Sequence, residues 1–129
     1  DRILAMCALH LKKKGMLRKD TVVATIMSNL ALDWVLRESG IAVIRTSVGD
    51  RNVMETMRKE GYNLGGEQSG HLIFLDYNTT GDGIVTALQV LSIMVEMGKS
   101  LAELARVMEP FPQVMKNIPV QVKTDLEAI

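Results

Sequence analysis

A chain of 129 residues has the length of about one domain, and at that size folding can bury roughly two-thirds of the unfolded chain's surface. A composition of 47% hydrophobic and 23% charged residues excludes intrinsic disorder. With 15 Lys and Arg against 15 Asp and Glu, the net charge is zero, so no long-range field attracts nucleic acid or anionic lipid. We therefore expect no nucleic acid and no membrane among its partners. Small molecules and proteins remain as candidate partners.

The sulfur-containing residues indicate a reducing compartment. The single cysteine, Cys7, cannot form an intramolecular disulfide, and the nine methionines would oxidise readily outside the cytoplasm. We expect a cytoplasmic protein. The chain also begins directly in a helical pattern, with no initiator Met and no cleavable leader, which suggests a piece of a longer polypeptide.

Helices and strands alternate through the first part of the chain. The expected elements are a helix over residues 3–14 that ends at Gly15, a strand over 21–26, a helix capped by Ser28 or Asn29 that ends at Gly40, and a buried strand over 41–44. This alternation predicts an α/β fold with right-handed crossovers.

The same pattern continues toward the C-terminus. The expected elements are a helix from Asp50, its cap, to Gly61, strands over 62–64 and 72–75, a long helix over 84–97, a short helix with a Ser100–Glu103 capping box, and an extended segment over 114–122 before a linker over 123–129. The long helix is apolar over most of its circumference, so we expect it to pack deeply in the core. It is shorter than the ~20 residues that a bilayer crossing requires. A short loop before the 72–75 strand favours antiparallel pairing and hence a mixed sheet.

The strongest chemical signal is the loop Gly65–His71, which joins two apolar strands. Loops at strand ends are where α/β sheets bind ligands. Gly66 and Gly70 would let the backbone approach a ligand closely, while Glu67 and Ser69 carry groups that bind sugar hydroxyls. By this chemistry alone, a sugar site and a hairpin whose polar groups face water are equally supported. An isolated histidine such as His71 is more often structural than catalytic.

Two other loops are weaker candidates. Val48–Arg51 is expected at a helix N-terminus, where free N–H groups favour an anion and Arg51 could contact a phosphate. The simpler interpretation is that Asp50 caps the helix and Arg51 is solvated. Thr79–Gly83 can be a plain turn before a helix. Cys7 and His10 lie one helical turn apart, but the chain has only one other histidine, so we expect no metal site.

Taken together, the motifs Gly66–His71, Val48–Arg51 and Thr79–Ile84, in this order and spacing, resemble the α-D-phosphohexomutase superfamily. The resemblance extends from Asp1 to about Val122 and looks closest to the phosphoglucosamine mutases of bacteria. It implies a three-layer α/β/α domain with a mixed, mainly four-stranded sheet over residues 1–122. This would be the third, sugar-binding domain of a four-domain enzyme, with residues 123–129 starting the linker to the fourth.

The resemblance also implies which functional parts of the full enzyme lie outside this chain. The family's phosphoserine loop, its Mg²⁺-binding loop and its main substrate-phosphate site belong to other domains, so we expect Mg²⁺ in the full-length enzyme but not in this chain. The partners are then a phosphosugar and the other domains of the same polypeptide. The full enzyme would interconvert glucosamine 6-phosphate and glucosamine 1-phosphate through a bisphosphate, for cell-wall precursors, and the isolated piece would be inactive.

In that scheme each motif residue has an expected role. Glu67 and Ser69, with the backbone at Gly66 and Gly70, would hold the sugar hydroxyls, and His71 would carry a proton or contact a phosphate. Asp50 and Arg51 would shape the neighbouring wall of the cleft. Two alternatives stay open: the same domain of a phosphomannomutase or phosphoglucomutase, and a standalone flavodoxin-like binding module.

Overall fold

The structure, a computed structural model, describes residues 1–116 and 119. Its elements are α1 (Arg2–Lys13), β1 (Thr21–Thr25), α2 (Leu30–Glu38), β2 (Ala42–Thr46), α3 (Asp50–Glu60), β3 (Leu64–Gly66), β4 (Leu72–Phe74), α4 (Gly83–Met97) and α5 (Leu101–Leu104), with short 3₁₀ turns at Arg18–Asp20 and Ala105–Val107. The linker predicted over 123–129, and most of the extended segment predicted over 114–122, lie outside the described residues.

The four strands form one mixed sheet in the order β2-β1-β3-β4. β1 is parallel to both β2 and β3, whereas β3 and β4 pair antiparallel, as predicted. All five residues of β1 are buried, which explains its uninterrupted β-branched and apolar sequence. The predicted mixed sheet is confirmed.

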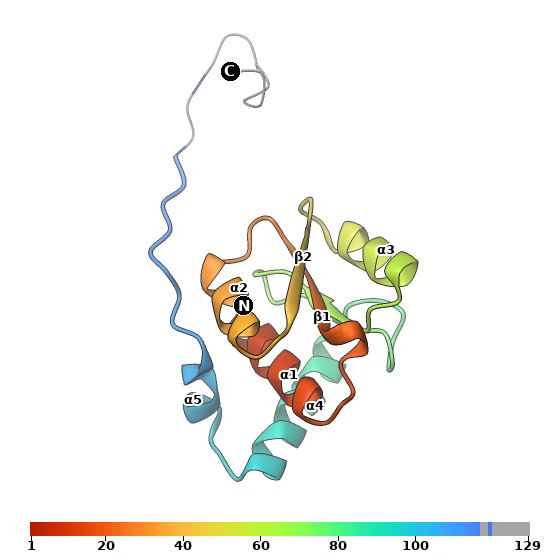
Figure 1. Cartoon of the computed structure of the whole chain (residues 1–129), viewed down its shortest axis with the longest axis vertical. Coiled ribbons are helices and arrows are strands. Elements are labelled where there is room, and N and C mark those ends of the chain that lie inside the picture. Colours follow the sequence, from red (N-terminus) through yellow and green to blue (C-terminus); the bar gives the residue numbers. More distant parts are fainter. Residues whose placement is uncertain (117–118, 120–129) are drawn as a thin grey trace.

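Helices cover both faces of this sheet (Figure 1). Val22 and Ala24 of β1 belong to the large core cluster that includes residues of α1, α2 and α4. Val23, between them, points to the opposite face and packs with Val53 and Met57 of α3. The three-layer α/β/α arrangement is therefore confirmed, with α3 alone forming one of its outer layers.

The strand predicted as buried over 41–44 is instead the edge strand β2, whose residues are all half-buried or exposed because only β1 pairs with it. The predicted start of the third strand and the predicted cap of α3 are also wrong. The third strand begins at Leu64, not at Tyr62, because the Tyr62 N–H closes the end of α3 by donating to Met57 O. The buried Asn63 side chain donates to Met16 O at 2.8 Å and accepts from the Arg18 N–H at 2.9 Å, which holds the chain out of the ladder. The N-cap of α3 is Gly49, at φ 122°, and Asp50 is the first helical residue.

The prediction that the 84–97 helix is packed deeply in the core is also wrong. Only Val90 and Ile93 of α4 are buried. The opposite side of the helix carries large apolar residues that are exposed, among them Ile84 and Val95. No single described helix is long and apolar enough to cross a membrane; α4 and the Leu101–Val107 segment meet that criterion only jointly, and they are bent by 93°.

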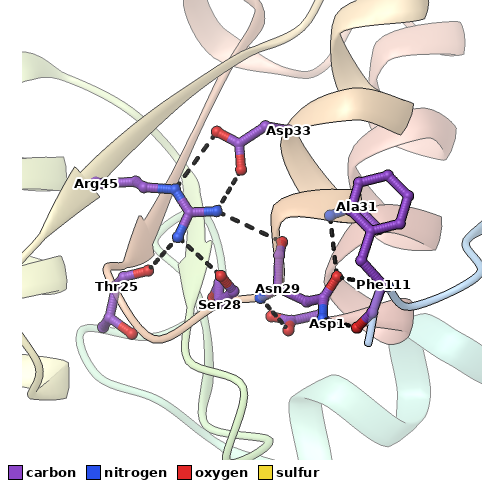
Figure 2. Close-up of polar contacts among 8 residues, drawn as sticks. All are labelled: Asp1, Thr25, Ser28, Asn29, Ala31, Asp33, Arg45 and Phe111. Atoms are coloured by element: carbon purple, nitrogen blue, oxygen red, sulfur yellow. Dashed lines mark hydrogen bonds and ion pairs between the residues drawn. The ribbon is translucent and has the colours of Figure 1, made fainter. Parts of the chain in front are cut away.

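The turn between β1 and α2 is held by one arginine (Figure 2). Arg45 of β2 donates to Ser28 O at 2.8 Å, to Thr25 O at 3.1 Å and to Asn29 O at 3.4 Å. Its guanidinium also pairs with the carboxylate of Asp33 in α2. Five donors in a rigid fork suit such a set of acceptors. Arg45 therefore fixes the backbone of the β1–α2 turn, which follows the carboxyl end of β1.

Asn29, in the same turn, joins three separate parts of the chain (Figure 2). Its side-chain oxygen caps α2 by accepting from Ala31 N–H at 3.0 Å and also accepts from Phe111 N–H at 3.0 Å. Its side-chain amide donates to Phe111 O at 2.9 Å, and its backbone N–H donates to the Asp1 carboxylate at 2.9 Å. The start of α1 and the segment after α5 are thus tied to the carboxyl edge of the sheet.

We predict that replacing Asn29 is more costly than replacing an ordinary helix cap. Asn29→Ala should lower the free energy of unfolding by about 2–3 kcal/mol, since it removes both a cap and the Phe111 hydrogen bonds. Ser100→Ala, which removes only the local cap of α5, should cost about 1 kcal/mol. Urea denaturation of both variants checks this. Equal losses would mean that the contacts to Phe111 contribute nothing.

Candidate functional site

The predicted site loops lie at the carboxyl edge of the sheet. β1, β2 and β3 run parallel, so the segments that follow them, residues 26–29, 47–49 and 67–71, emerge at the same edge. The chain after β1 enters α2 on one face, and the chain after β2 enters α3 on the other face. Adjacent loops that diverge in this way leave a crevice where α/β proteins bind ligands.

Glu67 connects two of these loops. One of its carboxylate oxygens, Oε1, accepts a hydrogen bond from the Gly49 N–H at 3.0 Å. Its own backbone N–H donates to His71 O at 3.0 Å, and its carbonyl accepts from the Gly70 N–H at 3.1 Å. Gly70 has φ +96°, a conformation that favours glycine. The carboxylate is thus oriented by the backbone of both loops, and its second oxygen is left for a ligand.

Gly66 allows the hairpin to close tightly before this turn. A Cβ at Gly66 would lie 2.8 Å from His71 O and 3.2 Å from the Leu72 Cα. Ser69 and Gly70 at the tip of the turn are exposed, whereas Glu67 and His71 at its base are half-buried. The turn therefore presents a fixed carboxylate at its base and a hydroxyl at its tip.

His71 is held between the second and third motifs. Its Nδ1 lies 3.4 Å from the Asp50 Oδ2. On its other side, a Cβ added to Gly81 would lie 2.1 Å from the ring Cδ2 and 2.2 Å from Nε2. The imidazole therefore rests directly on the backbone at Gly81. All three motifs meet at this ring.

Gly81 is the residue that sequence reasoning missed, because Thr79–Gly83 was interpreted as a plain turn. Asp82 does cap α4, accepting from the Ile84 N–H at 2.8 Å and the Val85 N–H at 3.0 Å. These bonds, with one from Asn78, lower the pKa of the Asp82 carboxyl. Gly81 and His71 lie on either side of β4 in the sequence, and their contact forms only when the chain after β4 folds back, so no local sequence signal indicates it.

Arg51 lies apart from this group. Its Nε donates to Glu55 Oε1 at 2.8 Å, one turn along α3, and its side chain is 83% exposed. This ion pair raises the pKa of the guanidinium above its usual value. The arrangement brings Asp50, Glu67 and His71 together but directs Arg51 along its own helix. Contact between Arg51 and a ligand stays a prediction.

A hollow of about 420 Å³ adjoins the turn. It is lined by Gln68, by Met27 of the β1–α2 turn and by Gln113, Val114 and Met115 of the segment that Asn29 anchors. Another hollow, of about 380 Å³, lies between α1 and α5 with an apolar lining that includes Met6 and Leu104. No motif residue lines it.

The groups at the turn are suited to hydrogen bonds with hydroxyl groups. Within residues 1–116 and 119, no three His, Cys, Asp or Glu side chains lie close enough together to hold a metal ion. A carboxylate oxygen, a hydroxyl and backbone amides instead offer both acceptors and donors for hydroxyl groups. Cys7 takes no part, because burial in α1 raises the pKa of its thiol to about 12.

We predict that Gly81→Ala displaces the imidazole of His71. The new methyl group would occupy the position of the ring, and a half-exposed side chain can move aside, so the free energy of unfolding should fall by less than ~1 kcal/mol. Gly83→Ala is the matched control, because its Cβ would meet nothing within 4 Å. The NMR signals of the His71 ring should change only in Gly81→Ala; identical spectra would contradict the contact.

Comparisons with known proteins identify the family of this chain. The family model described as phosphoglucomutase/phosphomannomutase, α/β/α domain III, matches residues 1–111. A phosphoglucosamine mutase of Citrifermentans bemidjiense is 57% identical over 98% of this chain, which spans 28% of that protein. One of Geobacter metallireducens is 58% identical over 100% of the chain, which spans 29% of it.

Solved structures show the same fold. A phosphoglucomutase/phosphomannomutase family protein from Burkholderia thailandensis aligns with a TM-score of 0.72 and 25% identity, over 83% of this chain and 23% of that one. An N-acetylphosphoglucosamine mutase of Aspergillus fumigatus aligns with a TM-score of 0.69 at 17% identity, over 87% of this chain and 28% of that one. The chain spans less than a third of each of these proteins. It belongs to the phosphoglucomutase/phosphomannomutase family, as an α/β/α domain III.

Proposed function

We propose that this chain is the sugar-binding domain of a longer phosphoglucosamine mutase, which interconverts glucosamine 6-phosphate and glucosamine 1-phosphate through a bisphosphate intermediate. The observation that carries the proposal is the oriented carboxylate of Glu67, fixed by the Gly49 N–H at the carboxyl edge of the sheet. The names of relatives that are 57% and 58% identical support this choice of sugar.

The turn's residues would hold the sugar while phosphate is transferred elsewhere in the enzyme. Oε2 of Glu67 accepts protons from sugar hydroxyls, and the exposed Ser69 hydroxyl both donates and accepts. Backbone at Gly66 and Gly70 permits close approach of the ring. Because these groups make no use of the phosphate, they suit a sugar that must bind in two orientations.

His71 would carry a proton at its Nε2. Its Nδ1 lies 3.4 Å from the Asp50 carboxylate, which leaves Nε2 for the proton that the ring would exchange with the substrate. Asp50 is thus a positioning residue, and Arg51 would extend the wall of the cleft toward a substrate phosphate. The Gly81 backbone keeps the ring beside the turn.

The Mg²⁺ on which such an enzyme would depend would be held by a loop of another domain, as the resemblance to the family implies. When bound, the metal neutralises phosphate charge during transfer. The partners of this domain would be the other domains of the same polypeptide and the phosphosugar. The buried, reduced Cys7 suits a protein of the cytoplasm.

A phosphomannomutase or phosphoglucomutase is less supported, because relatives that are 57% and 58% identical to this chain are phosphoglucosamine mutases. A standalone binding module is less supported still, since the chain matches one domain of much longer proteins. No observation at the site favours either alternative over the glucosamine phosphates.

We predict that Glu67→Gln in the full-length enzyme lowers kcat/KM for glucosamine 1-phosphate by roughly ten- to hundred-fold, because the amide keeps the Gly49 bond but loses a charged acceptor. Glu38→Gln at the end of α2 is the control, since Glu38 is exposed and belongs to none of the three motifs; it should have no effect. An unchanged kcat/KM for Glu67→Gln would refute the role of Glu67. Faster turnover of mannose or glucose phosphates would refute the choice of sugar.

A further inference from the structure

The apolar hollow of about 380 Å³ lies where α1 meets the end of α4 and the α5 region, and none of the three motifs contributes to its lining. Its apolar lining residues are Met6, Leu9, Met97, Leu104 and Val107. The volume falls within the range of ~300–1,000 Å³ that is typical of small-molecule sites. Methionine side chains are flexible and polarisable, so they adapt to the shape of an apolar ligand. We refer to this feature as the α1–α5 hollow.

Three cationic side chains stand at the opening of the α1–α5 hollow. Lys13, Lys99 and Arg106 line it and are exposed, whereas Met6 and Leu104 at its base are buried. Within residues 1–116 and 119, none of the three cations lies within 4.0 Å of a carboxylate. Their charge is therefore available to an anion that enters the hollow.

The other two titratable residues of the lining do not cancel this charge. The carboxylate of Glu103 accepts from the Ser100 N–H at 2.8 Å and from the Ser100 hydroxyl at 2.6 Å. His10 lies 3.3 Å from the Glu96 carboxylate, and burial lowers the pKa of its imidazole, which favours the neutral ring. Three cations against one carboxylate leave a net positive charge at the opening.

We propose that the α1–α5 hollow binds a small amphipathic anion, a single aliphatic chain that ends in a carboxylate. The chain would lie against Met6 and Leu104, and the carboxylate would meet Lys99 and Arg106, whose guanidinium can hold it through two parallel hydrogen bonds. The lining contains no aromatic ring, which favours a flexible chain over a flat ligand. A hollow of this volume suits one chain, so a free acid fits it better than a two-chain lipid of a membrane.

This inference is independent of the proposed function, because no residue of the candidate sugar site takes part in it. An apolar segment of protein is a poorer occupant than an anion, since covering the three cations without a counter-charge would cost desolvation free energy. A ligand that brings its own carboxylate avoids that cost.

The test titrates the full-length protein with decanoate below its micelle concentration, by calorimetry and by NMR of ¹³C-labelled methionine methyl groups. We expect one-to-one binding that shifts the methyl signals of Met6 and Met97. Octanoate should bind roughly ten-fold more weakly, because it buries two fewer methylene groups. Decylammonium, which has the same chain and the opposite charge, should shift neither signal.

Two variants and a matched control place the ligand in the hollow. Lys99→Gln/Arg106→Gln, at exposed positions, should weaken decanoate binding by roughly three- to ten-fold. Val107→Phe, which puts a ring into the hollow and changes no charge, should weaken it at least as much. Arg37→Gln/Lys59→Gln removes two exposed cations that do not line the hollow and should bind decanoate as the wild type does.

Four results would overturn the proposal. The absence of saturable decanoate binding would mean that the hollow is covered in the whole protein. Equal binding of decylammonium would refute a site for anions. Decanoate binding that is unchanged in both hollow variants would place the ligand on another apolar surface. Sedimentation with anionic phospholipid vesicles, without binding of free decanoate, would assign the cations to a membrane.

Discussion

The arrangement of this domain depends on the hydrogen bonds that hold the β1–α2 turn. Arg45 satisfies three backbone carbonyls of the turn, and Asn29 links it to the segment that contains Phe111. A turn without regular structure would otherwise leave buried polar groups unpaired at a cost of about 1–3 kcal/mol each. Because the bonds join β2, α2 and the segment after α5, they fix the edge of the sheet at which the candidate site lies.

The strand pairing at the carboxyl edge of the sheet determines the geometry of the candidate site. The parallel pairing of β1 with β2 and β3 places Gly49 beside Glu67, and the antiparallel return through β4 places His71 next to Gly81. Most of the orienting groups are backbone atoms, which explains why glycines are so frequent in the motifs. A ligand would meet a carboxylate and an imidazole that are already in position, so little ordering entropy is lost on binding.

Local sequence signals predicted those features that local physics determines. β1 has a β-branched run, and the capping box at Ser100 is formed as predicted. The start of β3 was misplaced because Asn63 acts through residues far away in sequence. The burial of α4 was misjudged because an apolar sequence predicts a buried helix, whereas large apolar residues on its outer side, such as Ile84 and Val95, are exposed among the described residues. For the site, the motifs were recognised separately, but the contact between His71 and Gly81 follows only from the tertiary fold.

The most direct test of the account is whether the turn binds the sugar phosphate. We would titrate the protein with glucosamine 6-phosphate at millimolar concentrations and follow its backbone amides by NMR. The account predicts shifts confined to residues 65–71 and to Gly49, and their loss in Glu67→Gln. Shifts on another surface, or identical shifts in wild type and Glu67→Gln, would contradict it.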